Sequence, residues 1–189
     1  GCCTEEPWLD AWSEDFNSGI AGWMTSDLTP PVVWHGADGA AVFHNPTTGT
    51  FANPAGGTSH GLLISPPLEV PPLGGIHLVE FEVSLETEWD DADPNDFFAA
   101  FVIDELMLRV AVNGDVAGAI EVWSSQYLLN TTQGQTLGVA ADLSPFAGES
   151  VQMVFEFDSG DANVNGFAGP VVDDVSFHTE CQVPECLID

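Results

Sequence analysis

Alternating apolar and polar residues mark one long segment of the chain as a half-buried strand. Between residues 75 and 91, Val79, Phe81, Val83 and Leu85 alternate with three glutamates and a serine. Successive side chains of an extended chain point to opposite faces. The pattern therefore predicts an antiparallel strand with one face in a core and one face in water.

Further segments show a similar pattern. Residues 150–159 repeat the alternation, and the apolar runs at 40–44, 95–104, 106–112 and 118–123 are additional strand candidates. We expect Val151, Met153, Phe155 and Phe157 to point inward. Helix signals are nearly absent, and most of the 19 glycines and 13 prolines lie between the apolar runs. Short strands joined by long Gly/Pro-rich loops predict an all-β protein, with a two-sheet sandwich as the leading architecture.

The segment GPVVDDVSF, residues 169–177, places two aspartates inside a predicted strand. Strict alternation puts Asp173 on the face of Val175 and Phe177, so we expect its carboxylate to point toward the core. A buried carboxylate is unfavourable unless it is protonated, hydrogen-bonded, paired or bound to a metal. Asp173 therefore needs a compensating group.

The charge of the chain is almost entirely negative. Thirty acidic residues face one basic residue, Arg109, and the formal net charge is −29. Such a polyanion repels phosphate backbones and anionic lipid surfaces, so we expect no nucleic-acid partner. The chain has no apolar run of about eighteen residues, so we expect no membrane-spanning segment. With a single basic residue in the chain, we expect surface ion pairs not to stabilise the fold in general, which favours bound divalent cations, a saline habitat, or both.

The four cysteines lie at the two ends of the chain, at Cys2, Cys3, Cys181 and Cys186. We expect tails at 1–11 and 179–189 around one domain at 12–178. Cysteines in this arrangement predict disulfides and an extracellular or cell-surface location, with a secretion signal already removed. The bridges would close one chain or link neighbouring subunits. A zinc site is an alternative, although four-thiolate sites usually come as Cys-x2-Cys pairs.

Two acidic loops are candidates for cation binding or for solvated turns. Alternating aspartates and asparagines suit calcium, but the glycine and distal glutamate of an EF-hand are missing. The first loop contains Asp91, Asp93, Asn95 and Asp96, of which we take Asp96 as a candidate ligand; the second contains Asp158, Asp161, Asn163 and Asn165.

Catalytic signatures are weak. Glu86, Glu88 and Asp90 would share one strand face, as paired carboxylates do in some glycosidases, but they continue an acidic face that we expect to be solvated. No H-E-x-x-H or G-x-S-x-G motif occurs. We interpret all five histidines as polar loop or surface residues and predict no catalytic residue; they are His35, His44, His60, His77 and His178.

Five short motifs appear in a characteristic order. They are SEDFNSGIAGW, VVWHG, LLISPPLEV, DLSPFAGESVQMVFEF and GPVVDDVSF. In this order they resemble the jelly-roll modules of the MAM and cleaved-adhesin type, over residues 12–178. The resemblance implies an extracellular two-sheet antiparallel jelly roll whose first and last strands lie near each other, which would bring the terminal cysteines together.

The resemblance also implies a structural calcium ion where the EDF segment meets the DDV segment. Asp15 and Asn17 would supply ligands from one side, and Asp173 or Asp174 from the other. Calcium takes six to eight oxygen ligands, and a bound ion would compensate Asp173. The alternative is a carboxylate that accepts hydrogen bonds from a neighbouring turn.

These observations predict a non-catalytic extracellular module with a structural or adhesive role. We expect it to be calcium-stabilised and to self-assemble as a filament or surface-layer subunit. Carbohydrate binding is the alternative, with Trp34 and Trp123 as stacking platforms. Asn130, in the sequence Asn-Thr-Thr, is a candidate glycan acceptor.

Overall fold

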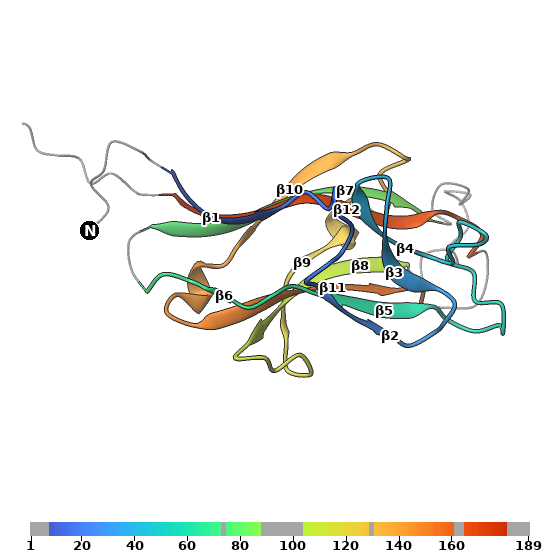
Figure 1. The fold of residues 1–189 in the computed structure, drawn as a ribbon, viewed down its shortest axis with the longest axis horizontal. Coiled ribbons are helices and arrows are strands. Elements are labelled where there is room, and N and C mark those ends of the chain that lie inside the picture. Colours follow the sequence, from blue (N-terminus) through green and yellow to red (C-terminus); the bar gives the residue numbers. More distant parts are fainter. Residues whose placement is uncertain (1–7, 73–74, 88–103, 129–130, 161–164, 181–189) are drawn as a thin grey trace, which may run out of the picture.

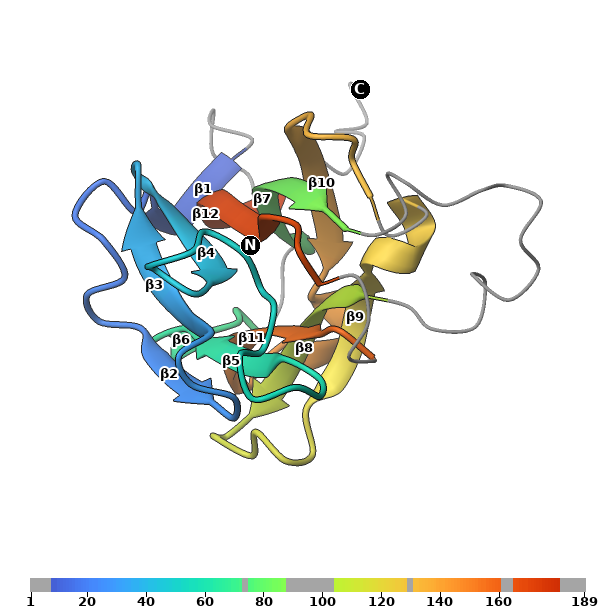
Figure 2. The same ribbon diagram turned by 90° about the vertical axis from the view of Figure 1, so that its right-hand side faces the viewer.

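The structure is a computed structural model that describes residues 8–72, 75–87, 104–128, 131–160 and 165–180. Within these residues twelve strands form two six-stranded antiparallel sheets. The sheets pack face to face, and Figure 2 shows the two layers from one end. The predicted all-β jelly-roll sandwich is confirmed. No helix of the described residues is long and apolar enough to cross a membrane.

The first layer, sheet A, has the order β10-β7-β12-β4-β3, and β1 also pairs with β12. Its strands are β1 (Trp8–Glu14), β3 (Val33–Ala37), β4 (Ala40–His44), β7 (Ile76–Glu86), β10 (Leu137–Asp142) and β12 (Gly169–Glu180). The first and last strands are therefore hydrogen-bonded neighbours, as the resemblance implied. In Figure 1 the blue β1 runs along the red β12.

The second layer, sheet B, has the order β2-β5-β11-β8-β9, and β6 also pairs with β11. Its strands are β2 (Met24–Asp27), β5 (His60–Ile64), β6 (Leu68–Glu69), β8 (Glu105–Val112), β9 (Ile120–Ser124) and β11 (Ser150–Asp158). Two short 3-10 turns, η3 (Ser125–Leu128) and η4 (Ser144–Phe146), complete the described elements. The strands predicted at 40–44, 106–112 and 118–123 are present as β4, β8 and β9; the one at 95–104 lies almost wholly outside the described residues.

The core lies between the sheets and follows the predicted alternation. The four inward residues of β7 are at most 2% exposed, and those of β11 are fully buried. Phe155 of β11 meets Phe81 of β7 with ring centroids 5.1 Å apart and lies 6.1 Å from Trp23. Burying each such ring contributes about 1.5–3 kcal/mol to the free energy of folding. Aromatic contacts between the layers therefore hold the sandwich together.

The long loop between β4 and β5 is attached to the body. Phe51 in this loop is fully buried, and its ring meets Phe157 edge to face at 5.2 Å. The Ser59 hydroxyl donates a hydrogen bond to the Phe51 carbonyl at 2.6 Å. The loop therefore closes one end of the core.

Candidate functional site

A β-bulge in β12 places both aspartates of the DDV motif on the outer surface of sheet A. The register against β7 shifts between Asp173 and Ser176, and Asp174 has a left-handed φ of 47°. Val172 and Val175 are both fully buried on either side of the bulge. The inserted residue breaks strict alternation, so the prediction that Asp173 points into the core is wrong. Asp173 is half-buried and Asp174 is exposed.

The bulge lies opposite the end of β1. Glu14 pairs with Val175, so the next residue along, Asp15, approaches Asp174. Asp15 and Asp174 line one depression of about 450 Å³, together with Ser13 and Ser176. The structure thus brings together two of the predicted ligands from opposite ends of the chain. We call this place the β1–β12 seam.

Local contacts orient the loop that carries Asp15. The Asn17 backbone N–H donates to Asp15 Oδ1 at 3.0 Å, which forms a tight turn. Phe16 adopts a φ of 47°. Its ring is 1% exposed and lies 5.2 Å from the Trp23 ring. The buried Phe16 ring therefore anchors the turn, and Asp15 remains on the surface.

Electrostatics couples the three carboxylates at the seam. Partial burial raises the pKa of Asp173, and the charges of Asp174 and Asp15 raise it further, against a hydrogen bond from the Asp174 backbone. Hydrogen bonds from the side chain and backbone of Asn17 lower the pKa of Asp15. The ionisation of Asp173 is therefore disfavoured by the negative charges of both neighbours.

The chemistry of the seam suits a hard cation only in part. Carboxylate and amide oxygens are ligands that calcium prefers. Among the described residues, however, no three or more His, Cys, Asp or Glu side chains are grouped so that they could hold a metal. An ion at the seam would rely on Asp15 and Asp174 and on further oxygens from amides, backbone or water. Asp96, Asn130 and the four cysteines lie outside the described residues.

The acidic surface continues from the seam across sheet A. A second depression of about 450 Å³ is lined by Glu80 and Glu82 of β7, by Gly138 to Ala140 of β10, and by Asp174. Glu82 also pairs in register with Asp173. The outer face of sheet A thus presents an acidic strip, as the sequence predicted for the polar side of β7.

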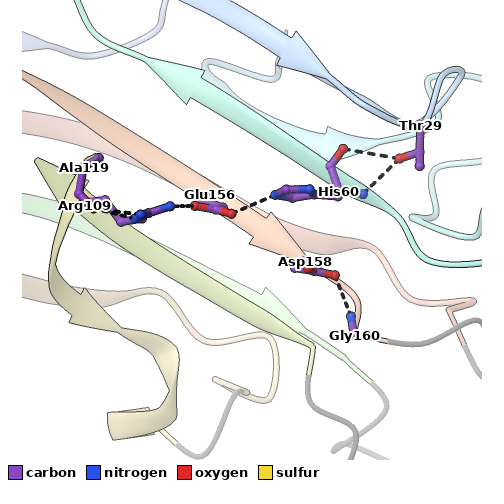
Figure 3. Close-up of polar contacts among 7 residues, drawn as sticks. All are labelled: Thr29, His60, Arg109, Ala119, Glu156, Asp158 and Gly160. Carbon is purple, nitrogen blue, oxygen red and sulfur yellow. Dashed lines mark hydrogen bonds and ion pairs between the residues drawn. The ribbon is translucent and has the colours of Figure 1, made fainter. Parts of the chain in front are cut away.

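The one arginine lies on the other layer. Arg109 Nη1 donates to Glu156 Oε2 at 2.6 Å, and its Nε and Nη2 donate to the Ala119 carbonyl at 3.2 and 2.7 Å. Glu156 Oε1 contacts His60 Nε2 at 2.8 Å. Figure 3 shows this chain of contacts across the outer face of sheet B. No motif in the sequence indicated these partners, and Arg109 does not reach the seam.

The tryptophans predicted as sugar platforms belong to the core. Trp34 is 2% exposed and Trp123 is 7% exposed. Their rings pack on Phe43 at 5.5 Å and on Phe81 at 5.3 Å. The stacking prediction is wrong for both, because period two turns each ring toward the opposite sheet. Tyr127 in η3, 76% exposed, is a described aromatic side chain that faces water.

Other predicted groups are only partly described. Asp158 Oδ1 accepts a hydrogen bond from the Gly160 N–H at 2.8 Å, which closes a turn. Asn165 is 5% exposed. The remaining acidic-loop candidates lie outside the described residues, as do Glu88 and Asp90, the carboxylates weighed with Glu86 for catalysis.

The histidines divide into two groups by burial. His77 and His178 are 1% and 4% exposed, so the interpretation of all five as surface residues is wrong for these two. His35, His44 and His60 are half-buried.

Comparisons with known proteins extend the fold assignment. No protein-family model matches the chain, and no curated protein matches it. A cleaved adhesin domain of Lys-gingipain from Porphyromonas gingivalis is similar in structure at 16% identity and a TM-score of 0.52, over 89% of this chain and 98% of that one. The bacteriophage CBA120 tailspike protein 4 enzymatically active domain has 14% identity and a TM-score of 0.50, over 89% of this chain and 21% of that one. At these identities the likeness shows a shared β-sandwich fold.

Proposed function

We propose that this chain is a non-catalytic extracellular module with an adhesive or structural role at a surface, stabilised by calcium at the β1–β12 seam. The observation that carries the proposal is the approach of Asp15 and Asp174 in one depression. The fold shared with the Lys-gingipain adhesin domain and the order of the five motifs support the adhesive role.

Charge explains why a cation would stabilise this seam. β1 and β12 pair over six residue pairs, and the two carboxylates that extend this pairing repel each other. A divalent ion would replace that repulsion with attraction and tie the first strand to the last. Calcium suits the site because it accepts water and backbone oxygens alongside carboxylates.

Self-assembly is the second part of the proposal. Within the described residues, β3 pairs with β4 alone and β10 pairs with β7 alone, so both are edges of sheet A. Neither edge contains the lysine or proline that commonly blocks edge-to-edge pairing. At a net charge of −29 copies repel one another. We therefore expect association to need divalent cations, with intersubunit disulfides locking the array.

A calcium titration tests the seam. Thermal unfolding of the chelator-treated chain should shift upward with calcium, and Asp15→Asn and Asp174→Asn should each reduce the shift. Glu86→Gln removes an exposed carboxylate elsewhere on sheet A and is the matched control. The seam site would be rejected if calcium did not change the unfolding temperature. It would also be rejected if the calcium-induced rise were the same in all three variants.

Light scattering after size-exclusion chromatography tests assembly. We expect oligomers with calcium that dissociate with chelator, and non-reducing gels whose ladder collapses with thiol. A monomer under every condition would reject self-assembly and leave the calcium result standing.

Carbohydrate binding is the second candidate. Tyr127 is exposed beside Gln126, whose Nε2 donates to Glu105 Oε1 at 3.0 Å. An exposed ring next to polar amide and carboxylate groups is a surface on which a sugar can stack. Affinity electrophoresis in polysaccharide gels should show retardation that Tyr127→Ala abolishes. Equal mobility of both proteins in every polysaccharide would reject this candidate.

A further inference from the structure

Two histidines meet on the β3–β4 hairpin, away from the acidic strip. Val33 pairs with His44, and His35 pairs with Val42, so the two histidines are diagonal neighbours on one face. The intervening Trp34 and Phe43 point into the core. The imidazole rings lie edge to face, with centroids 4.6 Å apart and planes at 86°.

Backbone carbonyls fix the same tautomer in both rings. His35 Nδ1 lies 3.2 Å from the Val33 carbonyl oxygen, and His44 Nδ1 lies 3.1 Å from the Asn45 carbonyl oxygen. A carbonyl oxygen only accepts hydrogen bonds, so each Nδ1 carries the hydrogen. In a neutral imidazole the lone pair then resides on Nε2. Metal-binding histidines are oriented in the same way, by a hydrogen bond from the nitrogen that does not bind the metal.

We propose that His35 and His44 form a two-nitrogen site for a borderline divalent transition-metal ion such as zinc, nickel or copper, bound through both Nε2 atoms. Imidazole nitrogens suit these ions, whereas calcium selects oxygen. Metal–nitrogen bonds are about 2.0–2.1 Å long, so rings that share one ion lie a few ångströms apart, consistent with the observed contact. The high negative charge of the chain also raises the local concentration of cations.

The site is open. Within the described part of the chain no third His, Cys, Asp or Glu completes a metal-binding group. In the proposed site, water or an external ligand takes the coordination positions that the two imidazoles leave. The competing explanation is a simple edge-to-face contact between two rings, which is favourable without any metal. The two explanations differ in what single substitutions do to metal affinity.

Copper titration of the full chain tests the proposal. The titration buffer contains millimolar calcium to compete for carboxylate sites, and the protein is treated with iodoacetamide beforehand to block any free thiol. Electron paramagnetic resonance should show one copper bound with two nitrogen ligands. His35→Gln and His44→Gln should each weaken copper binding roughly tenfold or more and leave one nitrogen. His60→Gln, a half-buried histidine on sheet B, is the matched control and should retain both.

Zinc and nitrogen NMR provide a second readout that needs no variant. Zinc should shift the Nε2 resonances of His35 and His44 together, and the metal-free spectrum should show hydrogen on Nδ1 of both. The proposal is overturned if wild type, His35→Gln and His44→Gln have the same copper affinity and the same number of nitrogen ligands. It is also overturned by a zinc shift confined to one of the two rings, or by hydrogen on Nε2 in the metal-free protein.

Discussion

Replacing Arg109 removes the one basic residue of a chain that contains thirty acidic residues. Its side chain is 28% exposed, and that of its partner Glu156 is 12% exposed. Arg109→Met keeps the apolar stem but removes one ion pair and two hydrogen bonds to the Ala119 carbonyl. Glu156 then remains with His60 as its other contact, and the 6% exposed Ala119 loses these donors.

The expected loss follows from these contacts. Hydrogen bonds to charged groups contribute about 1.5–3 kcal/mol each, and removing one partner of a buried pair costs about 3–5 kcal/mol. Partial exposure weakens both terms through solvent screening. We therefore expect Arg109→Met to lower the free energy of unfolding by about 2 kcal/mol, on the basis of these combined effects. For a chain of this size that corresponds to about 4–8 °C in melting temperature.

A double-mutant cycle separates the ion pair from general packing. Urea unfolding is measured for wild type, Arg109→Met, Glu156→Gln and the double variant. The double variant should recover part of the lost unfolding free energy. Without Arg109, the Glu156 carboxylate is an unpaired charge beside the apolar patch of Ile64 and Val154, and Glu156→Gln replaces it with a neutral amide. The unfolding free energy of Arg109→Lys should lie between those of wild type and Arg109→Met, since lysine keeps the charge without the planar guanidinium group. A loss below about 0.5 kcal/mol, or strictly additive single effects, would show that the ion pair does not stabilise sheet B.

Three further predictions concern the core, the seam and the edge. Phe155→Ala should lower the unfolding free energy by about 3–5 kcal/mol, measured by urea unfolding, because Phe155 is fully buried against Phe81; a loss below about 1 kcal/mol would contradict the core assignment. The raised pKa of Asp173 means that the folded state holds this proton more tightly than the unfolded state. The free energy of unfolding should therefore fall as the pH rises from about 3.8 through the raised pKa of Asp173 in the folded state. In calcium-free buffer Asp173→Asn should therefore be more stable relative to wild type at pH 7 than at pH 3, and a constant difference would contradict this. Ala140→Lys on β10 should weaken calcium-dependent association in light scattering with little change in melting temperature, whereas unchanged association would exclude this edge.

Much of the fold is readable in the sequence because period two is a local signal. The alternation in β7 and β11 identifies which residues meet the core without knowledge of their partners, and the Gly/Pro-rich connections identify an all-β chain. The inward set of β11 is buried as predicted, from Val151 to Phe157. The composition likewise predicts an acidic outer face, and Glu80 and Glu82 lie on it.

The site depended on register, which the sequence does not display. A bulge in β12 moved Asp173 to the surface, and strand pairing brought Asp15 to Asp174 from the other end of the chain. The diagonal contact of His35 with His44 likewise requires the exact offset of one hairpin. Local pattern therefore identifies the buried face of most strands. Which side chains meet is visible only in the folded chain, because each contact depends on strand register. At the seam the register joins strands that are remote in sequence and includes one extra residue in β12, and for the histidines it is the offset of one hairpin.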